Sequence, residues 1–447
     1  MCRSLGNPSA AVPTLHGPSG RPPNRFRYAP IGLLLSPFVT VSTPVLTRVT
    51  AVRRSVLTGA GVCLLSFAGF WIAQRLAAVS MIDLMVYRAE GRTVLDGLDL
   101  YAMRATRAGL PTTYPPFAAL LFTPLTLLPV PEMRTLATAG NLLLLVGFVH
   151  LSLKLAFRDA VKPGAALWVA AVAVWCEPVW TTLRYGQINL LIGVAVLWDL
   201  TRRDGHRWAG AGIGLAAAIK LTPALFAVML LITGLLRFRE AGWNPWLRQA
   251  TVAVGAFLAA TVASAVVLPS DSHRFWTEIV FRADRVGRVE GAANQSLRGV
   301  FARVLHTVDP SHWWLPVATV VAVAGLAVAV TAARRGRTAE ATVACAATAL
   351  LISPISWSHH WVWCVPTVLL LLAHGRTEWA VAVGVGFWSY ALWRVPHGAV
   401  ERLELAQNRS QMVLTAIYPT MALGMLVYLA VAGRKEPARG DYAVAKE

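Results

Sequence analysis

Long apolar segments separated by short, arginine-bearing segments recur along this chain of 447 residues and constrain its fold more than any other feature. The first strong segment, Ser55–Val79, is longer than the ~20 residues that an α-helix needs to cross a bilayer. Its apolar residues do not alternate with polar ones as they would in the strands of a membrane β-barrel. Charged residues make up 14% of the chain, against about 25% in a soluble domain. The sequence therefore predicts an all-α, polytopic integral membrane protein.

The arginines predict the topology, because cytoplasmic loops carry an excess of Lys and Arg. Arg48, Arg53 and Arg54 place the start of the first span in the cytoplasm. The same rule puts the loops at 201–208 and 334–339 in the cytoplasm, and it favours about twelve spans with both chain ends inside. The predicted spans lie at about 55–79, 132–157, 164–181, 188–200, 250–268, 313–333, 340–357 and 411–432, with two more between 208 and 237 and two between 360 and 393.

Three kinds of segment lie outside these spans. Residues 1–54, rich in Pro, Arg and Ser, and residues 433–447 are expected to be cytoplasmic tails, the first of them disordered. The loops 80–131 and 269–312 are expected on the external side. Within the first loop, Phe117–Leu128 is apolar but shorter than a span and is bracketed by prolines, which predicts a short interfacial or re-entrant helix.

The net charge of +19 suggests nucleic acid at first sight, but the arginines sit mainly in the short loops. That distribution is the membrane-topology signal, so no nucleic-acid partner is expected. The five cysteines form no Cys-x-x-Cys pair, and four lie in or beside apolar segments. Buried thiols are therefore expected, and a metal site is not.

Unusual polar residues gather on one side of this topology, at the external ends of the predicted spans. Lys220 interrupts an apolar run, where a charge costs ~2.5–3.5 kcal/mol on insertion scales. A site assembled from helix ends would have this pattern. The residues are Asp83, Tyr87, Tyr114, Glu177, Arg184, Gln187, Asn189, Lys220, Asn294, Gln295, His359 and His360.

Three motifs near the first external loop carry a family resemblance. They are Asp83-x-x-Val86-Tyr87, Leu95-x-Gly97-x-x-Leu100-Tyr101 and Tyr114-Pro115-Pro116-Phe117, followed later by Arg184-Tyr185-Gly186-Gln187-Ile188-Asn189 and Lys220-Leu221-Thr222-Pro223. Together with Asn294-Gln295-Ser296, they resemble glycosyltransferase family 87, the integral-membrane mannosyltransferases of actinobacteria with the GT-C fold. The resemblance covers neither residues 1–54 nor the C-terminal tail.

The resemblance implies a GT-C catalytic domain over residues 55–432, embedded in the plasma membrane with its active site on the external face. It implies polyprenyl-phosphate mannose as donor and a lipid-linked glycan, such as a phosphatidylinositol mannoside, as acceptor. It also implies inversion of a β-linked donor to an α-mannoside with an α-(1-2) linkage. The catalytic residue would be the acid after the first span, which is Asp83 here, and no cofactor or metal is expected.

The chemistry of such a transfer assigns roles to the gathered residues. The leaving phosphate is a weak base, so the reaction needs a base for the acceptor hydroxyl and cations for the phosphate. Asp83, His359 and His360 are candidate catalytic residues, and Lys220 and Arg184 are candidates for binding the donor phosphate. The candidates for binding other parts of the substrates are Tyr87, Tyr114, Glu177, Gln187, Asn189, Asn294 and Gln295.

Other interpretations stay open. Asp83 is also suited to capping a helix, and Glu177, which precedes Pro178, to a structural role. His359 and His360 are adjacent, so on an α-helix they point about 100° apart, and at most one is expected to face a site. At the level of function, the alternatives are a GT-C transferase of another sugar, such as arabinose or glucose, and a lipid or sugar transporter or flippase. One-sided polar residues disfavour the transporter, whose binding site would lie near the bilayer midplane.

Overall fold

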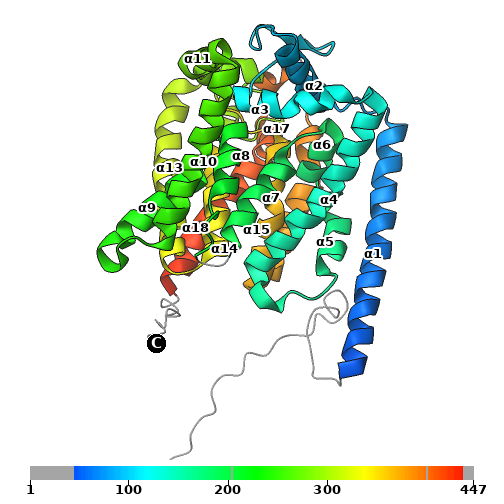
Figure 1. Ribbon diagram of the computed structural model, residues 1–447, viewed down its shortest axis with the longest axis vertical. Coiled ribbons are helices and arrows are strands. Elements are labelled where there is room, and N and C mark those ends of the chain that lie inside the picture. Colours follow the sequence, from blue (N-terminus) through cyan, green and yellow to red (C-terminus); the bar gives the residue numbers. More distant parts are fainter. Residues whose placement is uncertain (1–44, 203–204, 399–400, 436–447) are drawn as a thin grey trace, which may run out of the picture. The chain divides into compact units, whose positions relative to one another are not determined.

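The computed structural model describes residues 45–202, 205–398 and 401–435, and within these it is built from helices (Figure 1). The helices are α1 (Val45–Leu76), α2 (Ile82–Leu95), α3 (Pro116–Phe122), α4 (Val130–Phe157), α5 (Ala165–Ala173), α6 (Glu177–Tyr185), α7 (Asn189–Leu200), α8 (Ala211–Ile219), α9 (Ala224–Ala241), α10 (Pro245–Val267), α11 (Pro269–Thr277), α12 (Leu297–Val304), α13 (Ser311–Arg334), α14 (Thr338–Ile352), α15 (Cys364–Ala373), α16 (Thr377–Trp388), α17 (Arg409–Thr415) and α18 (Ile417–Lys435).

Short 3-10 helices and a single small hairpin complete the described structure. The 3-10 helices are η2 (Thr123–Leu127), η3 (Arg158–Ala160), η4 (Ile279–Phe281), η5 (Ala283–Val286), η6 (Ser358–Trp363), η7 (Ala391–Trp393) and η8 (Leu403–Ala406). The hairpin pairs β1 (Arg104–Ala105) with β2 (Leu110–Pro111) in antiparallel register. The predicted all-α class is confirmed.

In the described ranges, four helices are long and apolar enough to cross a membrane: Val52–Leu76, Val130–Phe157, Pro245–Val267 and Ser311–Arg334. Two bent pairs, α5 with α6 and α17 with α18, raise the number to six if each pair is one span. The helices at the remaining predicted positions are shorter than these four. For example, α7 has 12 residues and is therefore about 18 Å long, whereas the hydrocarbon core of a bilayer is about 30 Å thick. The protein is therefore an integral membrane protein, and the number of about twelve spans stays a prediction.

The predicted span at 164–181 is not a straight helix. It breaks after Ala173, and α6 leaves at 79° to α5. Pro178 explains the break, because proline lacks an amide hydrogen, clashes with the preceding helical turn and is favoured in the first turn of a new helix. The bend puts Glu177 at the buried start of α6 instead of within a span.

The boundaries of the predicted tails also need correction. Helix α1 begins at Val45, so residues 45–54 are helical and not part of a disordered tail. The apolar run defined the predicted boundary, but arginine is a good helix former and the helix extends through Arg48, Arg53 and Arg54. At the other end, α18 continues to Lys435. Residues 1–44 and 436–447 lie outside the described residues.

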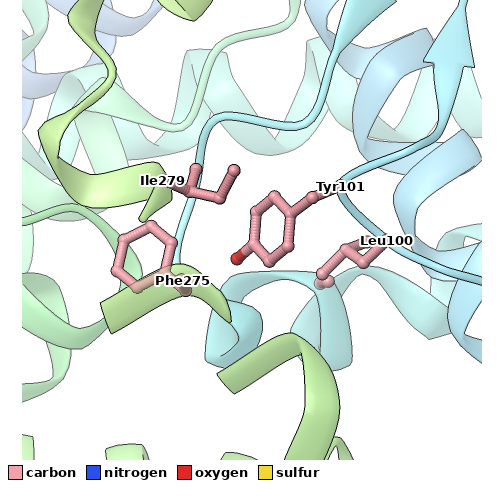
Figure 2. Packing of buried hydrophobic residues seen from close by; sticks show 5 residues of the cluster. Leu100, Tyr101, Phe275 and Ile279 are labelled. Carbon is pink, nitrogen blue, oxygen red and sulfur yellow. The ribbon is translucent and has the colours of Figure 1, made fainter. Parts of the chain in front are cut away.

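The two large predicted loops are folded and pack against each other. Tyr101 from the first loop stacks on Phe275 of α11, with ring centroids 5.9 Å apart (Figure 2). Leu100, Ala119 and Ile279 complete this buried cluster, and each is at most 4% exposed. An ion pair of 2.7 Å between Asp99 and Arg274 closes its outer edge. Segments more than 170 residues apart in sequence therefore form one wall.

The second loop is also fixed to the segment that carries the two histidines. Arg303 of α12 is 1% exposed, and its guanidinium donates to the backbone carbonyls of Glu290, Gly291, Asn294 and Thr415. Its NH groups thus satisfy carbonyls that would otherwise be buried without partners. A short antiparallel bridge then joins residue 294 to Trp357. This clamp brings the loop beside η6.

Candidate active site

A cavity of about 480 Å³ opens where the two folded loops meet the ends of the helices. Residues from α2, the Tyr114-Pro115 corner, the α6–α7 turn, the end of α8, η4, η5, η6 and η7 line it. The predicted site residues on its wall are Asp83, Tyr87, Tyr114, Gln187, Lys220, His359 and His360. The expected convergence of residues far apart in sequence is thus present in the fold.

Asp83 lies in the first turn of α2 and makes no capping hydrogen bond. One of its carboxylate oxygens accepts a hydrogen bond of 2.7 Å from the side-chain amide of Gln187. Gly186, just before Gln187, ends α6 with a φ of 69°, and a Cβ at this position would meet the Cβ of Leu84 at 2.7 Å. Only glycine combines that left-handed conformation with so close an approach of α6 to α2. The turn at Gly186 therefore places the Gln187 amide beside the Asp83 carboxylate.

Two tyrosines fix the orientation of Gln187. The hydroxyl groups of Tyr87 and Tyr114 lie 2.6 Å and 3.2 Å from the side-chain oxygen of Gln187 and donate to it. An amide whose oxygen accepts these two bonds presents its NH₂ group to Asp83. Tyr87 lies one turn after Asp83 on α2 and is 3% exposed, so the motif Asp83-x-x-Val86-Tyr87 builds one face of the site.

Burial alters the acid–base properties of the site. Desolvation raises the pKa of Asp83 to about 6, although the hydrogen bond from Gln187 and the charge of Lys220 act in the opposite direction. Desolvation also lowers the pKa of Lys220 to about 7, against the effect of the Asp83 carboxylate. Both groups therefore change charge near neutral pH, which is the property expected of an acid–base pair at a reaction centre.

Lys220 follows α8 and is held by two side chains. Its ammonium donates to the side-chain oxygen of Asn189 at 3.3 Å and to Nε2 of His360 at 2.9 Å. It also lies 5.7 Å from the centre of the Tyr114 ring. The described residues include no carboxylate in an ion pair with it. Lys220 is thus an oriented cation that faces a cavity and is available to an anion.

His359 and His360 both line the cavity, which corrects the expectation that at most one of them faces a site. The residues lie in η6, a 3-10 segment in which neighbouring side chains still point about 120° apart, so the cavity must border both sides of this segment. Their rings meet edge to face with centroids 4.7 Å apart. His360 contacts Lys220, whereas Nε2 of His359 is buried without a hydrogen-bond partner in the described structure. Such an orphaned nitrogen is suited to a substrate group.

Five expected site residues are not on the wall of this cavity. Asn189 contacts Lys220 without lining the cavity, and four others lie elsewhere. Arg184 is exposed on the last turn of α6. Asn294 and Gln295 are buried, and their side chains bond to the backbone of Val289, Ala292 and Thr415 and so hold the second loop in place. The sequence identified polar residues near the site but could not separate lining residues from the supports behind them.

Glu177, the fifth of these, is fully buried and fully satisfied. Its carboxylate accepts hydrogen bonds from Thr181 at 2.8 Å, Ser358 at 2.8 Å, Trp393 at 2.9 Å and Tyr418 at 2.7 Å. These donors come from α6, η6, η7 and α18. The structural interpretation of Glu177 therefore applies: it ties the histidine-bearing segment to the helices behind it.

The cavity has further lining residues that the sequence did not identify. Arg282 and Arg285 line it from the second loop, and Trp357, just before η6, and Trp393 of η7 also line it. Arg285 donates to the backbone carbonyl of Tyr101 at 2.8 Å. In the sequence, the two arginines lie in a segment of mixed charges, and the two tryptophans are among many tryptophans of the chain. Only the fold shows that these four residues line the cavity.

A much smaller cavity, about 40 Å³, adjoins the first at Lys220 and His360. Its other walls are mainly apolar and include Phe226, Leu350 and Trp363. Lys220 and His360 therefore border both cavities. In the described ranges no three His, Cys, Asp or Glu side chains are grouped so that they could hold a metal ion.

Comparisons with known proteins agree with one another. The sequence model of glycosyltransferase family 87 matches residues 113–354. A polyprenol-phosphate-mannose-dependent α-(1-2)-phosphatidylinositol mannoside mannosyltransferase of Mycolicibacterium smegmatis is 32% identical over 412 residues, covering 85% of this chain and 90% of the relative. A corresponding phosphatidylinositol pentamannoside mannosyltransferase of Mycobacterium tuberculosis is 34% identical over 351 residues, covering 74% of this chain and 77% of the relative.

Among solved structures, the crystal structure of ArnT from Cupriavidus metallidurans bound to undecaprenyl phosphate resembles the chain with a TM-score of 0.42. Its sequence is 17% identical, and the match covers 85% of this chain and 78% of the ArnT chain.

Proposed function

Because the chain belongs to glycosyltransferase family 87, we propose that it transfers mannose from polyprenol-phosphate-mannose to a phosphatidylinositol mannoside and forms an α-(1-2) bond. The relatives named above carry out this class of reaction. The observation that supports the proposal best is the placement of Asp83, fixed by Gln187, in the same cavity as the oriented cation Lys220.

In the proposed reaction, Asp83 is the base. Its carboxylate takes the proton of the acceptor hydroxyl as that oxygen forms a bond to the anomeric carbon of mannose. The bond from the anomeric carbon to the phosphate oxygen breaks, and the electron pair leaves with the polyprenol phosphate. A single displacement inverts a β-linked donor to an α-mannoside. The second oxygen of Asp83, which is not hydrogen-bonded within the described structure, is the one available to the acceptor.

Lys220 and His360 would hold the donor phosphate. Lys220 supplies a charge that the described protein does not neutralise with an ion pair, and His360 and Asn189 fix its direction. The adjoining apolar cavity places Phe226 and Leu350 on the side away from Asp83, where the first units of a polyprenyl chain would leave the phosphate. His359, with its unpartnered Nε2, would orient the acceptor.

The finer features of the fold belong to the same proposal. They are a GT-C domain over residues 55–432, about twelve spans and a site on the external face of the plasma membrane. Reporter fusions after Arg207 and after Arg288 test the orientation, since the first should be cytoplasmic and the second external. The same location for both fusions would contradict it.

A transfer assay tests the activity. Membranes that contain the protein, polyprenol-phosphate-mannose labelled in the mannose, and purified phosphatidylinositol mannosides should give a labelled, larger glycolipid. The product should be cleaved by an α-(1-2)-mannosidase. Transfer from a polyprenol-phosphate arabinose or glucose but not from the mannose donor would identify a transferase of another sugar. Movement of labelled lipid between leaflets without a new glycosidic bond would instead identify a flippase.

A further inference from the structure

A second polar cavity, of about 270 Å³, lies at the opposite end of α7 from the candidate active site. Helix α7 starts at Asn189, which contacts Lys220, and ends at Leu200, which lines this cavity. Twelve residues of α-helix separate the two cavities by about 18 Å. The polar residues that line the second cavity are Arg158, Asp199, Arg202, Arg248, Gln249 and Thr338.

The charges of this cavity favour an anion. Among its described lining residues, three are arginines and one, Asp199, is acidic. Arg202 approaches Asp199 to 3.9 Å. Arg158 donates to the backbone carbonyl of Gly336 at 3.2 Å, and no described carboxylate forms an ion pair with it or with Arg248. Two guanidinium groups that have no ion-pair partner among the described residues therefore border the cavity, an arrangement that recognises phosphate.

Asp199 adds an acceptor that needs a donor. It is 2% exposed, and one oxygen accepts a 2.8 Å hydrogen bond from the backbone amide of Ile213 at the start of α8. The other oxygen is buried and faces the Arg202 guanidinium at 3.9 Å, and it has no hydrogen-bond partner in the described structure. Buried carboxylate oxygens are almost always hydrogen-bonded, so a donor is missing here. The cavity thus offers cations for a phosphate and, beside them, an acceptor for a hydroxyl or ammonium group.

The surroundings indicate that the phosphate belongs to a lipid. Trp198, Trp208 and Trp243 are 54%, 58% and 64% exposed, and they lie on α7 or in the loops at this end of the helices. The guanidinium of Arg202 lies 5.3 Å from the ring centre of Trp198. Exposed indoles beside arginines are typical of the boundary between lipid tails and headgroups. A cavity at that depth meets phospholipid headgroups at high local concentration.

From this geometry we propose that the Arg158–Arg202–Arg248 cavity binds the headgroup of a phospholipid from the leaflet opposite the candidate active site. The phosphodiester contacts the guanidinium groups, and a hydroxyl or ammonium group beyond the phosphate donates to Asp199. This site is distinct from those for the donor and the acceptor. The proposal does not depend on which sugar the protein transfers.

Binding to purified protein in detergent tests the site, with native mass spectrometry or thermal unfolding as the readout. Dioctanoyl-phosphatidylglycerol carries one negative charge and hydroxyl groups, and dioctanoyl-phosphatidylmethanol carries the same charge without them. We expect the glycerol lipid to bind more tightly than the methanol lipid, and both more tightly than inorganic phosphate. Equal binding of the two lipids would overturn the role of Asp199. Inorganic phosphate that competes as well as the lipid would show a free-anion site and overturn the lipid assignment.

Substitutions locate the binding. Arg158→Gln combined with Arg248→Gln should weaken phosphatidylglycerol binding roughly 30-fold, since each basic residue near a lipid surface contributes roughly a fivefold factor. Arg207→Gln is the matched control, because Arg207 is exposed at the same end but does not line the cavity. Gel filtration and far-UV circular dichroism check that the variants are folded. Undiminished binding by the double variant, or an equal loss in the control, would overturn the proposal.

Discussion

The side-chain nitrogen of Gln187 lies 2.7 Å from a carboxylate oxygen of Asp83, and 104 residues separate the two in sequence. Because Tyr87 and Tyr114 occupy the oxygen of the same amide, Gln187 can only donate to Asp83. This bond stabilises the carboxylate form of Asp83 against the desolvation that raises its pKa. Gln187 is therefore a positioning residue for the proposed base.

The first prediction concerns this bond. Gln187→Glu replaces the donor by a second carboxylate, which disfavours ionisation of Asp83 and raises its pKa further. The acid limb of the pH–rate profile should move to higher pH, while transfer at high pH recovers in part. Gln187→Ala should lower kcat more than it changes either KM. Unshifted profiles in both variants would mean that Gln187 only fills space.

The second prediction concerns the base. Asp83→Asn retains the size of the side chain but cannot accept a proton at neutral pH, and general-base catalysis contributes roughly 10²–10⁴-fold. Transfer should fall by about that factor while expression and thermal unfolding stay normal. Asp96→Asn is the control, because Asp96 lies on the same segment, exposed and paired with Arg92.

Alanine at His359 tests the competing assignment. If His359→Ala abolishes transfer and Asp83→Asn does not, the imidazole is the base. Asp83 would then have an orienting role.

The third prediction is a bell-shaped pH dependence of kcat/KM. Asp83 must be deprotonated to act, so the rate should rise as pH increases through about 6. Lys220 must be protonated to bind phosphate, so the rate should fall as pH increases through about 7 in the free enzyme. Lys220→Arg keeps the cation at all accessible pH values and should remove the alkaline limb. An alkaline limb that persists in this variant would assign it to another group.

How much of this site follows from sequence can be judged from particular residues. Asp83, Tyr87 and Lys220 were identifiable, because charged and aromatic residues at the ends of apolar runs are costly and stand out. Arg184 and Gln187 lie three residues apart with equally polar side chains, yet only Gln187 reaches the cavity. The left-handed conformation of Gly186 reverses the chain between them, and this turn is a property of the fold.

The two histidines illustrate the same limit. Their side chains diverge in the 3-10 segment η6 as they would on an α-helix, yet the cavity reaches both of them. Tertiary hydrogen bonds hold η6 in place: the backbone carbonyl of His359 accepts from Thr182 at 2.8 Å and from Asn189 at 2.9 Å. These contacts span more than 160 residues, so local sequence patterns do not encode them.

The fourth prediction concerns the donor. Lys220→Ala removes the oriented ammonium and should raise the KM for polyprenol-phosphate-mannose by at least tenfold, as loss of a charge-assisted bond costs roughly 1.5–3 kcal/mol. The KM for the acceptor should change little. Lys154→Ala is a suitable control, because Lys154 is exposed on α4 away from the cavity. An equal change in both KM values would indicate a collapsed site instead of a lost phosphate contact.

The fifth prediction concerns Glu90, which lies two turns after Asp83 on α2 and is fully buried. Neither carboxylate oxygen has a hydrogen-bond partner in the described structure, and desolvation, with the charge of Asp83, raises the pKa of Glu90 well above its ordinary value. The folded protein is therefore required to keep Glu90 protonated at pH values where the unfolded chain has already released that proton. This requirement destabilises the folded state increasingly as pH rises above the ordinary pKa of glutamate.

Glu90→Gln removes that requirement while keeping the shape of the side chain. The variant should unfold at a higher temperature than the parent, with a larger difference near pH 8 than near pH 5, where the parent carries the proton at little cost. Thermal unfolding in detergent at both pH values measures the effect, and Glu132→Gln, an exposed site at the start of α4, is the control. A difference independent of pH would mean that Glu90 does not hold its proton in the folded state. A destabilised variant at both pH values would mean that Glu90 is ionised and serves as an acceptor for a donor beyond the described contacts.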